Sequence, residues 1–358
     1  AIGPYNTLLT LGGAGRFFDP TTSTYQYPQS YTPNQNANPD LKWEERHGKN
    51  IGVSFALFNT RLTGNVNVYN DVTKNLLFTY NVPVPPFFYN SILANVGDLT
   101  NKGVEVQLGG DIVQGKKFSW SLNGQITFSR TRITSLSGEY AGYKIASDKV
   151  PVGYAEGRGY ANNAITFLKV GYAPYVFNVP RFAGYSATVD PTTNSNQLYY
   201  AADGSKVADF NSAATYYADP TPKFTYGINS TFNYGNLGLN FFLRGVSGQK
   251  LFNDYRSIVD NISRLPGNNV TKEALTNVLI GSNTPYELWL TTASYLRLDN
   301  ITLSYNFQEI KGLGSLRVYV TGSNLFVISP YEGLDPEIRN GDSNQSYIDT
   351  NVSGDGFY

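Results

Sequence analysis

Hydrophobic and polar residues alternate with a period of two along much of the chain, a pattern typical of β-strands that have one apolar face. Between Phe224 and Tyr234, every second residue except Ser230 is aromatic or aliphatic, and Thr, Gly or Asn stands between them. We expect about ten strands. The same alternation predicts them at 51–57, 62–68, 104–112, 119–129, 237–244, 301–307 and 316–320, and a further strand is expected at Tyr5–Leu11.

Many of the predicted strands run nine residues or more, whereas strands of soluble domains average about five or six. A strand that crosses a membrane as part of a barrel needs about 9–11 residues. Such a strand turns an apolar face toward lipid and a polar face toward the lumen. The sequence therefore predicts an all-β protein, a transmembrane antiparallel β-barrel.

The connections between the strands alternate between short and long. Short connections are expected at 59–60, 114–117, 235–236 and 309–314, and long ones at 75–100, 137–222 and 253–292. Outer-membrane barrels have short periplasmic turns and long extracellular loops. To keep this alternation, the 137–222 stretch must contain either no membrane strand or two. One short helix is expected at 270–280, capped by Thr271 or Asn269.

Composition narrows the range of functions. Charged residues make up only 15% of the chain, and there are 28 Tyr and 21 Phe. The net charge is zero, so the chain lacks the basic excess expected of a nucleic-acid-binding protein. There is no Cys, and His47 is the only His, which excludes thiolate and multi-His metal sites. No catalytic constellation is evident, and we predict no enzyme activity, no metal and no cofactor.

Several short sequence motifs, taken in their order along the chain, resemble those of a known protein family. They are Asn-Pro-Asp-Leu-Lys-Trp-Glu at 38–44, Asn-Val-Gly-Asp-Leu-Thr-Asn-Lys-Gly-Val-Glu at 95–105, Asp-Pro-Thr-Pro-Lys-Phe at 219–224, Ser-Tyr-Leu-Arg-Leu-Asp-Asn-Ile-Thr-Leu at 294–303, and Thr-Gly-Ser-Asn-Leu-Phe at 321–326. From about Asn38 to Tyr358, the chain resembles the C-terminal part of a TonB-dependent outer-membrane transporter of the SusC/RagA family.

The resemblance implies a barrel of 22 strands, of which this chain would supply about 10–12. Residues 1–358 would then be the C-terminal portion of the barrel, and the plug domain and the N-terminal barrel strands would lie outside this chain. The implied function is import of an oligosaccharide or oligopeptide across the bacterial outer membrane. The implied partners are a SusD-like surface lipoprotein, the TonB–ExbB–ExbD machinery acting through the plug, the surrounding lipid and the rest of the barrel.

Two other functions share parts of the pattern. A passive porin would show the same alternation and the same loops. A soluble, secreted β-rich adhesin or glycan-binding module would also be rich in strands and aromatic residues.

Loop aromatics are the first candidates for contact with a substrate or partner. Phe87, Phe88 and Tyr89 follow a proline-rich stretch, and flat aromatic faces suit sugars, peptides or a protein surface. The alternative is that they pack together as the core of their own loop. The same choice applies to two Tyr pairs in the long 137–222 stretch, which could also belong to an interfacial aromatic girdle: Tyr199 with Tyr200, and Tyr216 with Tyr217.

Charged residues within predicted strands form the second group of candidates. Glu105, Arg244, Arg297 and Asp299 lie mostly at lumen-facing positions. An Arg or Lys at the lipid-facing midplane costs about 2–4 kcal/mol, so we expect these side chains to face inward. They could line the substrate path or hold the plug, although a polar lumen alone explains them.

Overall fold

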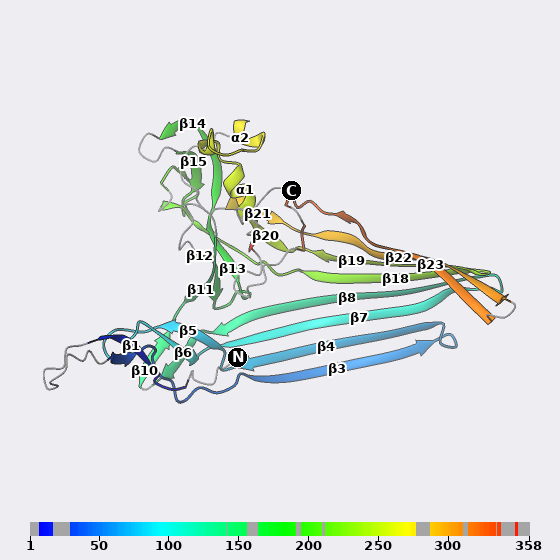
Figure 1. Ribbon diagram of the computed structural model, residues 1–358, viewed down its shortest axis with the longest axis horizontal. Coiled ribbons are helices and arrows are strands. Elements are labelled where there is room, and N and C mark those ends of the chain that lie inside the picture. The colour runs from blue at the N-terminus through cyan, green and yellow to red at the C-terminus, as the bar shows by residue number, and fades with distance from the viewer. Residues whose placement is uncertain are drawn as a thin grey trace.

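An eight-stranded antiparallel sheet dominates the computed structural model (Figure 1). The structure describes residues 7–16, 29–140, 142–155, 164–190, 195–209, 212–276, 287–310, 314–333, 335–337 and 348–349. The strand order across the sheet is β23-β22-β19-β18-β8-β7-β4-β3. The bounds of these strands are β3 Glu45–Leu57, β4 Leu62–Lys74, β7 Asp98–Gln114, β8 Phe118–Ser135, β18 Phe224–Tyr234, β19 Leu237–Ser247, β22 Tyr295–Ile310 and β23 Gly314–Ile328.

The eight strands contain the alternating segments that the sequence predicts, and several extend well beyond them. β7 has 17 residues and β8 has 18. The expected short turns join β3 to β4, β7 to β8, and β18 to β19, all at the same end of the sheet (Figure 1). In the two-residue turn between β18 and β19, Gly235 has a φ of 55°, which glycine adopts without steric cost.

The two faces of the sheet differ in polarity, as expected. On one face, Val68 is paired with Val104, which is paired with Phe128 on the next strand, and all three side chains are exposed. On the other face, Asn240 stands between Thr231 and Thr302. Exposed aliphatic and aromatic side chains over a continuous sheet face are suited to lipid, and the Asn- and Thr-rich face is suited to an aqueous lumen.

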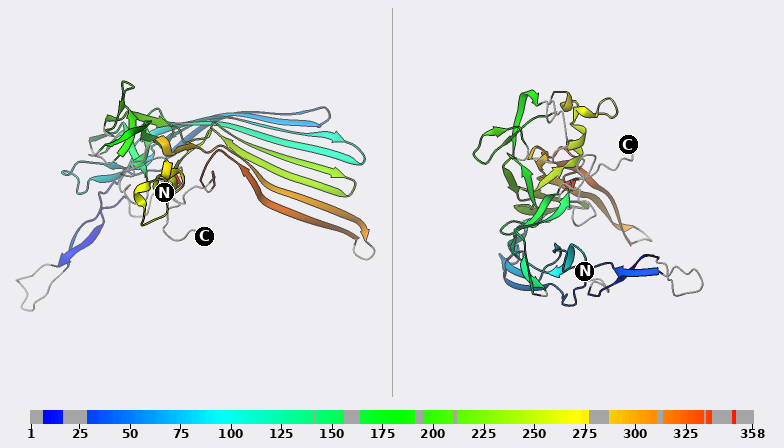
Figure 2. Two further views of the ribbon diagram at one scale, coloured as in Figure 1. Left: turned by 90° about the horizontal axis from the view of Figure 1, so that it is seen from above. Right: turned by 90° about the vertical axis from the view of Figure 1, so that its left-hand side faces the viewer.

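The sheet is a curved wall that fans out toward the short turns (Figure 2). Among the described residues, its outer strands β3 and β23 each pair on one side only. Within the same residues, no helix is long and apolar enough to cross a membrane.

The long connections lie at the opposite end and form small sheets of their own. Residues 77–95 form a hairpin of β5 (Leu77–Asn81) and β6 (Ser91–Asn95). β8 pairs directly with β18, so the 137–222 stretch adds no strand to the wall, which is one of the two options that the alternation allowed. Its short strands are β9 Ser137–Tyr140, β10 Tyr143–Ala146, β11 Lys149–Tyr154, β12 Ala164–Lys169, β13 Val176–Pro180, β14 Phe182–Asp190, β15 Ser195–Tyr200, β16 Lys206–Val207 and β17 Thr215–Ala218.

The third long connection packs against the second. A shared core contains Ile165 and Phe177 from the second connection and Ile258 and Trp289 from the third. In its described residues, the third connection contains four short helices and the strands next to them, which are β20 Lys250–Asn253, α1 Asp254–Val259, η2 Ile262–Arg264, α2 Glu273–Thr276, η3 Glu287–Trp289 and β21 Leu290–Thr292. A short strand from later in the chain, β24 Ile348–Asp349, pairs with β20. α2 lies in the predicted helix, and the backbone N–H of Ala274 donates to Thr271 Oγ1 at 3.3 Å, as expected of a cap. Residues 277–280 of that prediction lie outside the described residues.

The strand expected at Tyr5–Leu11 is wrong over the part that the structure describes. Residues 7–10 are not in a strand, and Tyr5 lies outside the described residues. The strand β1 begins at Leu11 and runs to Arg16, and it pairs only with β2 (Gln29–Pro33). Leu8 and Leu9 are adjacent and both exposed, so this segment lacks the alternation that would give it one apolar face. The β1–β2 hairpin projects away from the wall (Figure 2).

Candidate functional site

The proline-rich aromatic loop connects β5 to β6 and is held by one buried side chain. Asn36 Oδ1 accepts hydrogen bonds from the backbone N–H groups of Phe88 (2.9 Å) and Tyr89 (3.2 Å). Asn36 Nδ2 donates to the carbonyl oxygens of Tyr89 (2.6 Å) and Ser91 (2.7 Å). The loop therefore has a fixed conformation, set from a segment more than fifty residues earlier in the chain.

The three aromatic side chains of this loop have different surroundings. Phe87 packs on a buried core, with ring centroids 6.3 Å from Tyr140 and 5.4 Å from Tyr143. Phe88 is 65% exposed. Tyr89 is partly exposed, and its hydroxyl donates to the carbonyl of Pro33. Phe87 is thus a core residue of the loop, and Phe88 is the ring available to a ligand.

The two tyrosines of the first Tyr pair also have different surroundings. Tyr199 is only 3% exposed and belongs to the shared loop core, where its hydroxyl donates to Gln197 Oε1 at 2.7 Å. Tyr200 is half-buried, and the guanidinium of Arg181 lies 5.3 Å from its ring centroid. Tyr199 is therefore structural, and the face of Tyr200 carries a cation–π contact.

Lysines cover the second Tyr pair. Lys250 Nζ lies 5.9 Å from the ring centroid of Tyr216, and Lys169 Nζ lies 5.2 Å from that of Tyr217. The Tyr217 ring also lies 5.0 Å from that of Tyr172. Both tyrosines lie in the layer of long connections, at the end of the wall opposite the short turns.

Three of the four predicted charges come together on the lumen face of β19 and β22. Arg244 is the direct cross-strand neighbour of Arg297, and Asp299 sits at a bulge beside them. Arg244 Nε donates to Asp299 Oδ1 at 2.6 Å. Arg297 has a side chain only 5% exposed, so its charge must be balanced inside the protein.

A segment after β23 supplies that balance. Arg297 Nη2 donates to both carboxylate oxygens of Asp335, at 2.6 and 2.8 Å. Glu337 accepts from Arg244 Nη2 at 3.0 Å and from the Tyr295 hydroxyl at 2.9 Å, and its carboxylate lies 3.2 Å from Arg297 Nε. Burial alone would raise the pKa of Glu337, but the hydrogen bonds from Arg244 and Tyr295 hold it below its usual value. The network anchors residues 335–337 to the lumen wall.

Glu105 lies apart from this network. Its cross-strand neighbours are Asn67 and Thr127, and its side chain is exposed on the lumen face. Sequence reasoning missed Asp335 and Glu337. They lie two positions apart in a turn, in which the backbone N–H of Glu337 donates to Asp335 Oδ1 at 2.8 Å. Among the described residues, no group of three or more His, Asp or Glu side chains is placed to hold a metal ion.

Comparison with known proteins defines the class. Residues 4–325 match the family model described as TonB dependent receptor-like, beta-barrel. Because this match covers most of the chain, the chain belongs to that family, whose members are outer-membrane β-barrels.

Individual relatives narrow the class further. The chain is 33% identical over 321 residues to the TonB-dependent receptor SusC of Bacteroides thetaiotaomicron, a match that covers 85% of this chain and 30% of SusC. It is 26% identical over 366 residues to a TonB-dependent receptor of Formosa agariphila, covering 95% of this chain and 35% of that protein. The chain thus spans about a third of the length of these relatives, and it is SusC-like.

Solved structures give the same fold. The structure titled as the RagAB peptide importer in its open-open state superposes with a TM-score of 0.74 at 23% identity, covering 97% of this chain and 36% of that chain. A structure titled as the RagAB peptide transporter superposes with a TM-score of 0.70 at 25% identity, covering 97% and 37%. The wall and its loop layer therefore have the architecture of a SusC/RagA-like barrel.

Proposed function

We propose that this chain forms part of the barrel wall of an importer that takes up a nutrient across the bacterial outer membrane, driven by TonB. The observation that carries the proposal is the eight-stranded wall, which has an exposed apolar face and a polar lumen face. Membership in the TonB-dependent receptor family supports energy coupling over passive flow. The relatives are receptors and transporters, so the proposed function involves no covalent chemistry.

In this proposal, residues 1–358 are the C-terminal portion of a larger barrel. The one-sided pairing of β3 and β23 within the described residues supports this arrangement, since a barrel leaves no strand edge open. The remaining wall strands and the plug would come from the rest of the protein. The plug would couple the barrel to TonB–ExbB–ExbD.

The proposed partner at the extracellular face is a SusD-like lipoprotein. Support comes from the SusC relative and from the loop layer, which is a packed platform with buried cores. Phe88 and Tyr200 are the candidates for contact there. The proposed cargo is an oligosaccharide or an oligopeptide, and an oligopeptide has support from the solved structure titled as the RagAB peptide transporter.

The lumen charges take two proposed roles. Arg244 and Arg297 hold the 335–337 segment against the wall, because their charges are engaged by Asp335 and Glu337. Asp299 supports this role by balancing part of the charge of Arg244. Glu105 is exposed to the lumen and is the charge available to a passing substrate.

Uptake by the full-length transporter tests the proposal. Cells that carry it are given labelled oligosaccharides and labelled oligopeptides, with TonB present or deleted. We expect uptake of one class, lost without TonB. Uptake that persists without TonB would instead establish a passive porin, the rival that shares the same wall.

A further inference from the structure

Two basic side chains stand side by side at the extracellular rim of the wall. Lys102 on β7 and Arg130 on β8 are direct cross-strand neighbours. The register is unbroken from this pair to Val104 and Phe128, two residues nearer the membrane. Since side chains alternate along a strand, Lys102 and Arg130 point to the same outward face as Val104 and Phe128.

This pair of charges is uncompensated within the described part of the chain. Both side chains are exposed, and no described carboxylate forms an ion pair with either of them. Like charges placed directly opposite on neighbouring strands repel each other. An anion that binds between the two side chains would relieve this repulsion, so the pair is suited to bind an anion.

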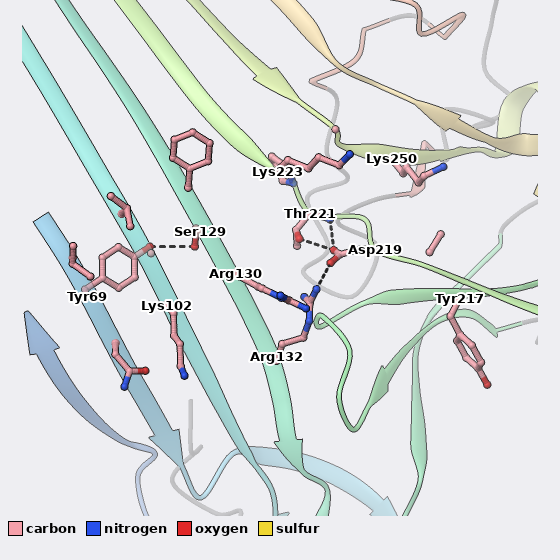
Figure 3. A pocket seen from close by; sticks show the side chains of 18 of the residues that line it. Tyr69, Lys102, Ser129, Arg130, Arg132, Tyr217, Asp219, Thr221, Lys223 and Lys250 are labelled. Atoms are coloured by element: carbon pink, nitrogen blue, oxygen red, sulfur yellow. Dashed lines mark hydrogen bonds and ion pairs between the residues drawn. The ribbon is translucent and has the colours of Figure 1, made fainter. Parts of the chain in front are cut away.

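A groove of about 900 Å³ lies beside the pair, between the end of β8 and the segment that leads into β18 (Figure 3). It has one lining carboxylate, Asp219, which lies 2.9 Å from Arg132 Nη2 and accepts from the backbone N–H of Thr221 at 2.9 Å. The groove therefore carries a clear excess of positive charge. Its basic residues are Lys102, Arg130, Arg132, Lys223 and Lys250.

Aromatic side chains place this groove at the level of the lipid headgroups. At the extracellular end of the outward face, the rings of Phe128 and Phe224 lie 5.6 Å apart, and at the other end those of Trp120 and Phe232 lie 5.4 Å apart. From Phe118 to Phe128 the strand rises about 33 Å, which at a tilt near 40° is about 25 Å along the membrane normal, the height of a barrel's apolar band. The basic pair of Lys102 and Arg130 lies two residues beyond Val104 and Phe128, toward the extracellular side.

We propose that Lys102 and Arg130, with the groove beside them, bind the phosphate of an anionic lipid headgroup in the outer leaflet. Arg and Lys form charge-assisted hydrogen bonds with phosphate oxygens. The same groove is also lined by the apolar side chains of Val68, Val104 and Phe128, against which an acyl chain would lie. On its outward side the groove joins apolar and basic walls, which matches an amphipathic anion, and at its other side it is lined by Tyr69 and Ser129, which have the lumen-facing phase of their strands.

Lipid binding to the purified full-length transporter tests this site. Native mass spectrometry would follow titration with phosphatidic acid and with the zwitterionic lipid phosphatidylcholine. The test variant is Lys102→Gln with Arg130→Gln. The matched control is Lys116→Gln with Lys117→Gln, which removes two charges from the turn at the opposite end of the same two strands.

We expect the test variant to bind phosphatidic acid about 25-fold more weakly, from a factor of about five for each basic group near an anionic surface. The control variant should bind phosphatidic acid as the wild type does, and phosphatidylcholine should bind all three proteins weakly. Equal phosphatidic acid binding by wild type and test variant would overturn the proposal. Displacement of the lipid by inorganic phosphate alone would also overturn it, because the site would then recognise a free anion. TonB-dependent uptake, measured separately, tests the proposed function without reference to this groove.

Discussion

Arg244 and Arg297 face each other as direct cross-strand neighbours on the lumen wall, a placement of two like charges that is destabilising unless anions join them. Asp299, Asp335 and Glu337 are those anions. The pair of arginines thus depends on a segment that follows β23. This network of ion pairs and hydrogen bonds attaches residues 335–337 to the wall.

Removing one arginine should detach residues 335–337 from the wall. We expect Arg297→Gln in the full-length transporter to cost about 1.5–3 kcal/mol, because Asp335, which is partly exposed, loses a charged bidentate hydrogen-bond partner. Hydrogen exchange of residues 335–337 and thermal unfolding would measure the effect. Arg317→Gln, an exposed change on the neighbouring strand, should cost less than about 0.5 kcal/mol. Equal effects of the two variants would show that the network contributes no stability.

Acid should loosen the same segment. The pKa of Glu337 is lowered in the folded protein, so its stabilising contribution is full above the ordinary glutamate pKa of about 4.3. That contribution is lost as the pH falls through the lower, folded-state pKa. The protection of residues 335–337 against hydrogen exchange, taken relative to the intrinsic rate at each pH, should therefore fall more below this pH than that of the β5–β6 hairpin. In Glu337→Gln, fast exchange is expected already at neutral pH, and a wild-type-like slow exchange would contradict the assignment.

A hydrogen bond on the lipid-facing side offers a second stability test. Trp120 Nε1 donates to Ser230 Oγ at 3.0 Å, and Ser230 is the one polar residue in the apolar row of β18. Ser230→Ala should cost about 1–3 kcal/mol, because the indole N–H would be left without a partner in an apolar setting. In the Trp120→Phe background the same change should cost much less. Additive costs in this double-mutant cycle would show that the two side chains do not interact.

The proline-rich loop provides a matched pair of aromatic variants. Phe87→Ala should destabilise the loop by about 2–4 kcal/mol, because the ring packs against Tyr140 and Tyr143. Phe88→Ala should leave stability unchanged and lower uptake or affinity for the lipoprotein. Limited proteolysis and uptake by the full-length protein would separate the two effects. Unchanged uptake and unchanged lipoprotein affinity in Phe88→Ala would remove this ring from the proposed contacts.

The wall could be predicted from the sequence because its signal is local. Period-two alternation in segments such as Phe224–Tyr234 determines both the strand and the face that each residue takes. The same alternation places Lys102 and Arg130 in phase with Val104 and Phe128, although their significance emerges only when the register sets them side by side.

The surroundings of the candidate site residues could not be predicted in the same way, because they depend on contacts between residues far apart in the sequence. Asn36 fixes a loop more than fifty residues away, and Glu337 reaches Arg244 across 93 positions. Tyr199 and Phe88 have similar neighbours in the sequence, yet one is buried in a core and the other is exposed. The extent of burial followed from how the loops pack together, which single-sequence patterns do not specify.

Accessibility along one strand tests the central claim that this sheet is a membrane wall with a lipid face and a lumen face. The chain has no Cys, so single cysteines can be placed at each position of β18 in the full-length transporter. A fluorophore at Phe224, Tyr226, Ile228 or Phe232 should be quenched from the lipid phase, and one at Thr225, Asn229, Thr231 or Asn233 by a water-soluble reagent. A strict period of two is the predicted result. Equal access of the water-soluble reagent to both sets of positions would contradict the account.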